Sequence, residues 1–582
     1  MSLPQLELQG SLFESLGSIA AELFSEQDKY KLFATKIWPI LVGQRQELEE
    51  LYDAGNGRPA IEPVVLFGVL IFQFLERVPD RQAAELVKYH LGWKLALNLK
   101  LSYQGFHFTN LSNFRDRLIV SGKSNLAFNG LLKALSQEGF VQKRSKQRLD
   151  SSQILGAVAL LSALECIRET LRLALEELQR VLQPGELPDF WPLFWERYVE
   201  NKLDYKSSAE VLKDKQRQAG NDCLRLLQWL EALATEVREG RQLRLLREVF
   251  AQQYELKDAQ LPEPVQKHAG AVIQNPHDPE AQWSTKGKGK HQKKGVGYKV
   301  QVAETVPQSN EQTQPSFITS IVTQRATESD AAGLEKTLQA QAETQVVSLS
   351  ELYVDSAYVS AERLAQANEE GWQLVGPAQA SPYQQEITAG YRLEDFQIDI
   401  PARQALCPAG LVSKQCSRIH EQARNKVFYR FEWASHCHHC ELRADCLSNS
   451  AAHRIITVGE HYQLLEQRRG EQKTQQFKER MQQRNAIEGT ISELVRAHGL
   501  RRSRYRGFAK VELQNFFIAT ACNIKRWLHA AIEPKPAPND AQCQYFQTPA
   551  IPFWPFFRPI SGIRRPLGLA HASTLSPVAL SC

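Results

Sequence analysis

Three acidic residues occupy positions from which carboxylates could hold metal ions. Asp150 follows an extended segment, and Asp355 directly follows the apolar run Leu352–Val354, which is typical of a buried strand. An acid at the carboxyl end of such a strand lies at the sheet edge where α/β proteins bind ligands. Glu488 belongs to an amphipathic helical segment further along the chain. Carboxylates from two strands and one helix are what two divalent cations need if oxygen ligands must hold them around a phosphodiester.

Each of these acids also has a purely structural interpretation. An aspartate beside a strand often caps a helix or closes a turn. Arg484 stands one helical turn before Glu488 on the same flank, so the two could form an ion pair worth about a few tenths of a kcal/mol. Asp278 is an alternative first acid, although Pro279 directly after it favours a turn that leads into a strand. Asp150 is therefore preferred, and the metal site is inferred only from the three acids together.

Several cysteines are clustered in one stretch of the chain. Cys437, Cys440 and Cys446 are separated by two and then five residues, and Cys407 lies upstream in a turn-like Cys-Pro-Ala-Gly segment. Thiolates at this spacing match the four tetrahedral ligands of a structural Zn²⁺ ion. Reduced cysteines without a metal are the alternative, and substitute ligands would be Cys416, His436, His438 and His439. The site is not expected to be catalytic, because four thiolates leave no open coordination position.

The first residues and the longest apolar run predict the compartment. The opening segment MSLPQLELQGSLFESLG contains two acids and no early basic cluster, so no secretory signal is expected. The run Val64–Leu75 is interrupted by Gly68 and Gln73 and is shorter than the roughly 18 residues that span a bilayer. We therefore expect an intracellular protein with reduced cysteines and no membrane association.

Basic residues are concentrated in two stretches that contain no acid. The formal net charge of only +5, from 70 basic and 65 acidic residues, does not by itself indicate a nucleic-acid-binding protein. One stretch lies between Glu280 and Glu304 and the other between Glu493 and Glu512, and both flank segments that carry the acids. Solvated surface charge is the alternative, but phosphate contact is favoured. The predicted DNA-binding residues are Lys286, Lys288, Lys290, Lys293, Lys294, Lys299, Arg496, Arg501, Arg502, Arg504 and Arg506.

Hydrophobic periodicity predicts the elements that must position these residues. Residues 12–140 are helical in pattern, and 155–182 form a second, strongly helical stretch. After residue 297 short β-type runs alternate with helical segments, which indicates an α/β sheet. The expected strands are 298–303, 317–323, 351–355 and 373–375, and the expected helices are 329–342, 360–371, 476–498 and 507–533.

The length of the chain predicts several folded units. Its 582 residues, 43% apolar and 23% charged, suffice for about three or four units with buried cores. We expect a helical domain at 1–143, an α/β core at 144–376 with a helical insertion at about 156–268, a Cys-rich insertion at 377–475, further core helices at 476–535 and a disordered tail at 536–582.

Blocks of sequence in the same order resemble one protein family, the DDE transposases of bacterial insertion sequences, and within it the group named for insertion sequence 1182. LYDAGNGRPAIEPVVLFGVLIFQFLERVPDRQAAELV, from Leu51, resembles the helical InsH-type N-terminal domain. DSSQILGAVA at Asp150 and YVDSAYVS at Tyr353 resemble the two aspartate motifs, although Ser152 replaces the usual Thr. The matches cover about residues 30–530.

Two further blocks carry the resemblance. DPEAQWSTKG and GYKVQVAET resemble the second-strand block, with Gln301 where His is commoner. The segment RNAIEGTISELVRAHGLRRSRYRGFAKVELQNFFIATACNIKRW resembles the glutamate helix and its continuation. In the helix signature of the wider superfamily, Arg484 and Glu488 fit, whereas Met481 and Val495 stand where Tyr and Lys are usual. That departure concerns roles specific to DNA hairpins and leaves the carboxylates unaffected.

The resemblance implies a fold, an activity and partners. It implies an RNase H-like α/β catalytic domain with helical and zinc-knuckle insertions, preceded by an all-α DNA-binding domain. Asp150, Asp355 and Glu488 would hold two Mg²⁺ or Mn²⁺ ions for cleavage and strand transfer of double-stranded DNA, with Arg484 in support. A homodimer in a synaptic complex and a bacterial, cytoplasmic, nucleoid-associated location are implied too. A catalytically inactive DNA-binding relative and a nuclease without strand transfer are the alternatives.

Overall fold

The computed structural model describes most of the chain between residues 22 and 532. The described residues are 22–52, 60–202, 207–257, 261–265, 272–286, 293–307, 315–379, 390–447 and 451–532. All of them belong to the unit Met1–Glu533, and the predicted tail at 536–582 lies outside them. Within this part of the chain, no helix combines the length and the apolar character needed to cross a bilayer.

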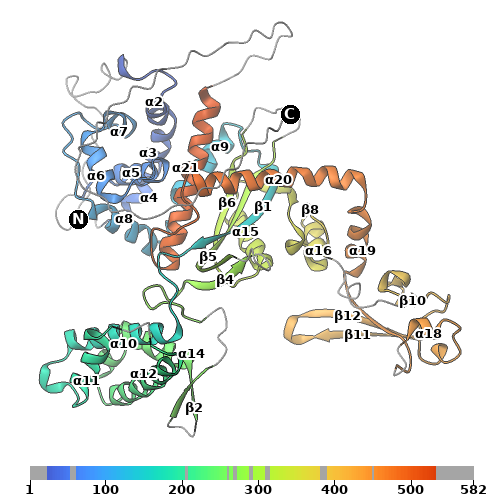
Figure 1. Cartoon of the computed structure of the whole chain (residues 1–582). Helices are drawn as coiled ribbons and strands as arrows, with labels where there is room; N and C mark the ends of the chain where they lie inside the picture. Colours follow the sequence, from blue (N-terminus) through green and yellow to red (C-terminus); the bar gives the residue numbers. More distant parts are fainter. Residues whose placement is uncertain are drawn as a thin grey trace, which may run out of the picture. The chain divides into compact units, whose positions relative to one another are not determined.

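Short helices make up the first part of the described chain (Figure 1). Central among them is α5 (Pro63–Leu75), which starts with Pro at a favoured first helical position and buries almost every side chain. A helix that is apolar all round must be surrounded by other elements. The other helices of this part are α2 (Lys29–Leu32), η1 (Phe33–Ile37), α3 (Trp38–Gly43), α4 (Arg45–Glu49), α6 (Asp80–Tyr89), α7 (Leu91–Ala96), α8 (Thr109–Val120) and α9 (Leu126–Gln137).

A mixed sheet follows the helices. Its strands are β1 (Arg144–Leu155), β4 (Gln282–Lys286), β5 (Lys293–Thr305), β6 (Ile318–Arg325), β7 (Ser348–Tyr353) and β8 (Gln373–Val375). Strand β1 is central, antiparallel to β5 on one side and parallel to β7 on the other, and β8 continues the parallel part. The first part of β5 pairs with β4 and the later part with β6, both antiparallel. The expected α/β sheet is thus present, with antiparallel strands on one side and parallel strands on the other.

The two faces of the sheet are covered by different helices. Gln147 on β1 hydrogen-bonds to Gln341 of α15 (Asp330–Thr344), and Leu149 packs with Leu334 of the same helix. Side chains alternate along a strand, so Arg148 and Asp150 point the other way. That second face is covered by α20 (Gln475–Arg496) and α21 (Phe508–Ile532), as Figure 1 shows.

Helix α21 joins the sheet and the N-terminal helices into one hydrophobic core. Phe517 of α21 stacks with Phe74 and meets Phe67 edge to face, each at a ring-centroid distance of 5.9 Å. On the sheet side, Asn523 of α21 exchanges hydrogen bonds with the backbone of Ile318. The boundary predicted at residue 143 therefore falls between two elements that pack into the same core.

Two insertions have hydrophobic cores of their own. The helical one begins with a capping box, Ser162 with Glu165, and contains α10 (Ala163–Val181), η2 (Pro184–Glu186), α11 (Trp191–Trp195), η3 (Glu196–Glu200), α12 (Ala209–Leu230), α13 (Thr235–Arg238), α14 (Arg241–Gln253), β2 (Tyr254–Lys257) and β3 (Leu261–Pro264). The Cys-rich one contains β9 (Gln397–Asp399), β10 (Gln404–Leu406), β11 (Gln415–Glu421), β12 (Lys426–Glu432), η8 (Ala434–Cys437), α18 (Arg443–Cys446), β13 (Ile455–Gly459) and α19 (Tyr462–Glu471).

Gly297 on β5 lies directly against the backbone of β1. A Cβ atom there would lie 2.0 Å from the carbonyl oxygen of Ile154 and 2.6 Å from the amide nitrogen of Gly156. Because paired backbone cannot move aside, we expect Gly297→Ala to lower the free energy of unfolding by at least about 2 kcal/mol. Gly295→Ala is the matched control, since its Cβ would meet only the flexible end of Leu155. Urea unfolding measures both, and an equal loss in the two variants would contradict this explanation.

Candidate active site

Asp150 lies on β1 and points toward α20. Its side chain is 18% exposed, and its Oδ2 accepts a hydrogen bond of 2.9 Å from Nη2 of Arg484. The other oxygen, Oδ1, accepts the amide hydrogen of Ser151 at 2.7 Å. The carboxylate is therefore held in orientation by its own strand, while one oxygen remains directed at the helix that carries Glu488.

Asp355 follows β7, the parallel neighbour of β1. Its Oδ1 accepts the amide hydrogen of Ala357 at 2.8 Å and so caps the short helix η5 (Ser356–Tyr358). Its Oδ2 lies 4.0 Å from Nη2 of Arg484, and the side chain is 42% exposed. Capping does not prevent Asp355 from acting as a metal ligand, because the cap uses only Oδ1. The other oxygen, Oδ2, faces Arg484, the residue that also pairs with Asp150.

Arg484 brings the two aspartates together. One guanidinium nitrogen serves both carboxylates, although they come from strands separated by some 200 residues of chain. The Nε atom of Arg484 is buried and has no hydrogen-bond partner among the described residues. The i, i+4 pair with Glu488 that the sequence allows is not formed in the structure. The positively charged guanidinium of Arg484 lies between the two aspartates. A metal ion bound there would experience the same negative charge.

Glu488 lies on the same helix, one turn after Arg484. Ile487 and Thr490 on either side of it are buried against the core, whereas Glu488 itself is exposed. Residues four apart on a helix share a flank, so Glu488 lies on the flank that carries Arg484. The structure thus brings Asp150, Asp355 and Arg484 into contact and places Glu488 one helical turn away without a contact to either aspartate.

Tyr358 connects the elements that carry the two aspartates, and sequence reasoning missed it. Its hydroxyl donates to Oε1 of Gln301 on β5 at 2.7 Å. Burial, and then the negative charges of Asp330, Asp150 and Asp355, raise the pKa of Tyr358 well above its ordinary value, while a hydrogen bond with Ser151 opposes this. A neutral phenol therefore ties the turn after Asp355 to the strand residue after Asp150. Its position three residues after Asp355 was the only available signal.

Asp278, the alternative first acid, is a capping residue. It is fully buried, and its Oδ1 accepts from the hydroxyl of Tyr298 at 2.6 Å and from the amide of Gly507 at 3.2 Å. Glu280 accepts the next amide, that of Phe508, at 2.7 Å, so the two acids cap the start of α21. Tyr298 pairs with Ile154, four residues along β1 from Asp150. Asp278 contacts neither Asp355 nor Arg484.

Asp278→Asn tests this role through the pH dependence of stability. Burial raises the pKa of Asp278 above its ordinary 3.8, so the folded chain holds this proton more tightly than the unfolded chain. The stability of the wild type relative to Asp278→Asn should therefore fall as pH rises from 3.8 through the raised pKa. Denaturant unfolding at several pH values measures it. DNA cleavage, the activity that the family resemblance implies, should survive the substitution. Loss of cleavage in a folded Asp278→Asn variant would make Asp278, rather than Asp150, the first of the three catalytic acids.

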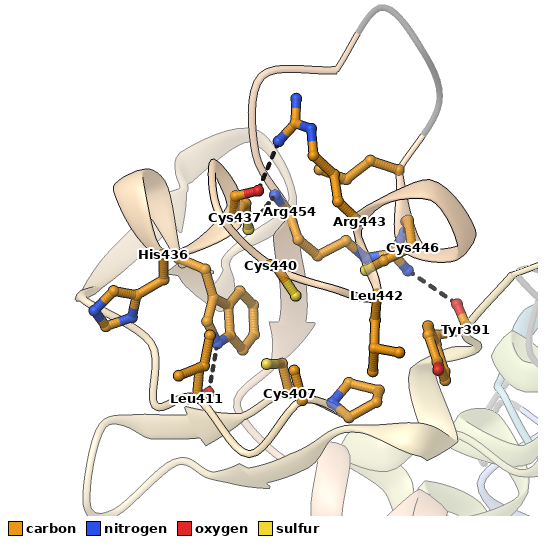
Figure 2. Close-up of a pocket in the computed structure, with 14 residues that line it drawn as sticks. Tyr391, Cys407, Leu411, His436, Cys437, Cys440, Leu442, Arg443, Cys446 and Arg454 are labelled. Atoms are coloured by element: carbon orange, nitrogen blue, oxygen red, sulfur yellow. Dashed lines mark hydrogen bonds between the residues drawn. The ribbon is translucent and has the colours of Figure 1, made fainter.

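The four predicted zinc ligands line one small cavity in the Cys-rich insertion. Figure 2 shows the sulfur atoms of Cys407, Cys437, Cys440 and Cys446 around a common space, while His436 points away from it. All four thiols are free, and the cavity has a volume of about 20 Å³, room for one small ion. Burial and the three neighbouring thiols raise the pKa of Cys446, against the opposing charge of Arg454. The amide of Arg454 donates to Sγ of Cys437 at 3.5 Å.

A tighter group of metal-ligand types lies elsewhere and is poorly suited to a cation. Among the described residues, Glu493, His498 and Cys522 have ligand atoms within 4.8 Å of one another, a spacing that the cavity cysteines do not reach. Arg526 donates to Glu493 at 2.8 Å, and Lys525 lies 3.5 Å away. The positive charges of Arg526 and Lys525 already neutralise the carboxylate of Glu493. We therefore interpret this group as a polar contact between α20 and α21.

Some residues of the basic stretches are engaged within the protein and others are exposed, and Arg504 is both. Arg501 donates to the carbonyl of Gln153 at 3.1 Å, the guanidinium of Arg504 lies 4.9 Å from the Phe74 ring, and Lys299 pairs with Asp330 at 3.2 Å. These three are engaged within the protein. Arg496, Arg502 and Arg506 are exposed, Lys286, Lys293 and Lys294 lie on the paired strands β4 and β5, and Lys288 and Lys290 are outside the described residues.

Two protein families match parts of this chain. The family described as Transposase domain (DUF772) matches residues 22–117, within the N-terminal helices. The family described as Transposase DDE domain matches residues 406–528, from β10 through α20 to most of α21, and so includes Glu488 but neither aspartate. No curated protein and no solved structure matches the chain. The chain thus matches two transposase domains whose pairing is typical of the DDE transposases of bacterial insertion sequences and fits the insertion sequence 1182 group.

Proposed function

We propose that this transposase binds the terminal inverted repeats of its element and catalyses metal-dependent cleavage and strand transfer of double-stranded DNA. The observation that carries the proposal is the convergence of Asp150 and Asp355 on one guanidinium, that of Arg484, beside the helix that bears Glu488. Asp150 is on β1, Asp355 follows the parallel neighbour β7, and Glu488 is on a helix that covers the face of the sheet to which Asp150 points. Such a cluster is suited to oxygen-coordinated divalent cations.

The strand order supports an RNase H-like catalytic domain. The order β6, β5, β1, β7, β8 places three antiparallel strands first and two parallel strands after them. Asp150 lies on the central strand just past the stretch Arg144–Arg148 that pairs with β7, and Asp355 lies just past the end of β7, so both are near the carboxyl end of this parallel pair, where α/β sheets bind ligands. The helical insertion enters after β1 and the Cys-rich insertion before α20, so the core would be assembled from separate parts of the chain.

Asp150, Asp355 and Glu488 would hold two Mg²⁺ or Mn²⁺ ions. Held by these carboxylates, divalent ions would supply the Lewis acidity needed to ionise an attacking water or 3′-hydroxyl and to stabilise the leaving oxygen of an in-line phosphoryl transfer. With the metal ions bound to the aspartates, the guanidinium of Arg484 would be released from them and would pair with a phosphate oxygen of the DNA instead. The η5 cap and the amide of Ser151 would keep the aspartate oxygens in place.

DNA contacts would come from the exposed basic residues beside this site. Arg496, Arg502 and Arg506 lie in and around the segment between α20 and α21, and Lys286 and Lys293 are backbone partners on the paired strands β4 and β5. Binding should weaken steeply with salt, as expected for phosphate contacts. A homodimer would hold two ends in a synaptic complex. Cys407, Cys437, Cys440 and Cys446 would hold a structural Zn²⁺ ion, for which the cavity they line has space.

A cleavage assay on duplexes that carry the terminal repeats tests the proposal. In Mg²⁺ the full chain should nick the repeat at its end, and in the presence of a target plasmid it should give joined products. Binding of the repeats without cleavage in either Mg²⁺ or Mn²⁺ would indicate a catalytically inactive relative. Cleavage without joined products would indicate a nuclease. A scrambled duplex of the same length is the control for sequence-specific binding.

A further inference from the structure

A completely buried carboxylate lies beside the candidate active site and is not one of the three acids. Glu304 on β5 is 0% exposed. Its Oε1 accepts from Nε of Arg148 at 2.6 Å, and its Oε2 accepts from Oγ1 of Thr490 at 2.6 Å and from Nη1 of Arg526 at 3.0 Å. A buried charge is stable only when it is paired and hydrogen-bonded, and Glu304 meets both conditions.

Two of the three partners of Glu304, Arg148 and Thr490, belong to the elements that carry Asp150 and Glu488. Arg148 is two residues before Asp150 on β1 and so points to the same face. Thr490 is two residues after Glu488 on α20. Arg148 also donates from Nη1 to the carbonyl of Gln483 at 3.0 Å, directly before Arg484. One carboxylate on β5 thus links the strand of Asp150 to the helix of Glu488.

Arg526 on α21 also holds helix α20 in place. Its Nη2 donates to Oγ1 of Thr490 at 2.6 Å and to Glu493 at 2.8 Å. Helix α20 is therefore held by hydrogen bonds at Gln483, Thr490 and Glu493, positions that lie before and after Glu488. Apolar packing would also hold the helix against the sheet, but hydrogen bonds are directional and so determine its rotation and its position along its axis.

We propose that Glu304 is a positioning residue that keeps Glu488 in register with Asp150. The proposal rests on the proposed function, because it gives Glu304 its role through Glu488. A helix rises about 1.5 Å per residue, so a small slip of α20 would displace the Glu488 carboxylate by a distance that matters for catalysis. Mg²⁺ requires near-ideal octahedral geometry, and groups that orient metal ligands typically change affinity or activity by about 10–100-fold when removed.

Thr490→Val and Glu304→Gln test the proposal in the full-length chain. Valine keeps the shape of threonine and removes one hydroxyl, so Thr490→Val should fold even if Glu304→Gln, which unbalances two buried arginines, does not. In both variants, we expect one of the two Mn²⁺ ions to bind about tenfold more weakly. Mn²⁺ is titrated into the protein without DNA, and the bound ions are counted by electron paramagnetic resonance. Mg²⁺-dependent end cleavage should fall by a similar factor, with a higher Mg²⁺ requirement and unchanged end binding.

Thr319→Val is the matched control. Thr319 is likewise a buried threonine, but it lies on strand β6, and its hydroxyl donates to Gln147 at 2.6 Å in a network that reaches α15 rather than α20. It should change stability without changing Mn²⁺ binding. Equal Mn²⁺ affinity in the wild type, Thr490→Val and Thr319→Val would overturn the proposal, as would equal weakening in both variants. A wild type that binds no Mn²⁺ and cuts no end would instead contradict the proposed function.

Discussion

Asp355→Asn is expected to abolish Mg²⁺-dependent cleavage of the transposon end while end binding persists. Asparagine has nearly the same size and can still accept the amide hydrogen of Ala357, so the η5 turn should remain. The variant loses the anionic oxygen that faces Arg484, and with it a ligand for a divalent cation. We expect a fall on the order of 10³-fold in cleavage rate, as for removal of a group that stabilises charge in a transition state. Single-turnover cleavage of a labelled duplex measures it.

Glu351→Gln is the matched control for that experiment. Glu351 lies on β7, four residues before Asp355, and pairs with Lys146 and Arg480 at 2.9 Å each. Although burial acts in the opposite direction, hydrogen bonds from Tyr353, Lys146 and Arg480 lower the pKa of Glu351 to about 2. Its charge is therefore used within the protein, and cleavage should stay within a few-fold of the wild type. Full cleavage by folded Asp355→Asn would reject the assignment of the second acid.

Loss of the proposed Zn²⁺ ion is expected to unfold the Cys-rich insertion. Purified protein should contain about one Zn²⁺ per chain, and Cys440→Ser should lose it, because three thiolates and a hydroxyl hold zinc less tightly than four thiolates. The small core around Trp433 and Phe431 includes Cys407, Cys437 and Cys446 as partly buried neighbours, so its packing depends on the same residues. Binding of structural zinc can contribute about 10 kcal/mol or more to folding, which exceeds what so small a core supplies.

Atomic absorption measures the zinc content, and limited proteolysis detects unfolding of the Cys-rich insertion. Cleavage by protease should become rapid between β9 and β13 in Cys440→Ser or after chelation, while the sheet core stays protected. Cys416→Ser is the control, since Cys416 lies on β11 in the same insertion and does not line the cavity. If the wild type retains no zinc at neutral pH, or if Cys440→Ser and Cys416→Ser have equal zinc contents, the cavity is not a zinc site.

Many elements of the core could be predicted from the sequence. The strands expected at 298–303, 317–323 and 373–375 lie within or overlap β5, β6 and β8, and the helices expected at 476–498 and 507–533 correspond to α20 and α21. These segments have a clear hydrophobic period because each buries one face or both faces in the main core. The first aspartate, Asp150, was expected at the end of a strand, but β1 continues beyond it to Leu155.

No strand was expected within the Cys-rich insertion at 377–475, yet this segment contains β9 to β13. Strand β11 reads QCSRIHE, and most of its side chains are exposed or half exposed. Its neighbour β12 buries only Tyr429 and Phe431 fully. A small sheet covered on one face by a small core has little apolar alternation, so these strands have no strong periodic signal. Their pairing is decided by tertiary contacts.

The role of Glu304 was likewise hidden, although a local signal exists. Val300 and Val302 are inward-facing residues of β5, and Glu304 continues the same alternation. An acid at an inward-facing position requires a buried cation, but the sequence does not show which one. Arg148 and Arg526 lie 156 and 222 residues away along the chain, so the match could be seen only in the folded structure.

Residue types and their spacing are enough to predict which chemical groups this protein offers: three acids after strands or on a helix, clustered thiols, acid-free basic stretches and the order of strands and helices. These features are local. Which of the groups meet depends on the fold. It placed Arg484 between Asp150 and Asp355, assigned Asp278 to the cap of α21 and engaged Arg501, Arg504 and Lys299 within the protein. Such contacts join residues far apart in the chain, and their partners depend on how the whole core packs.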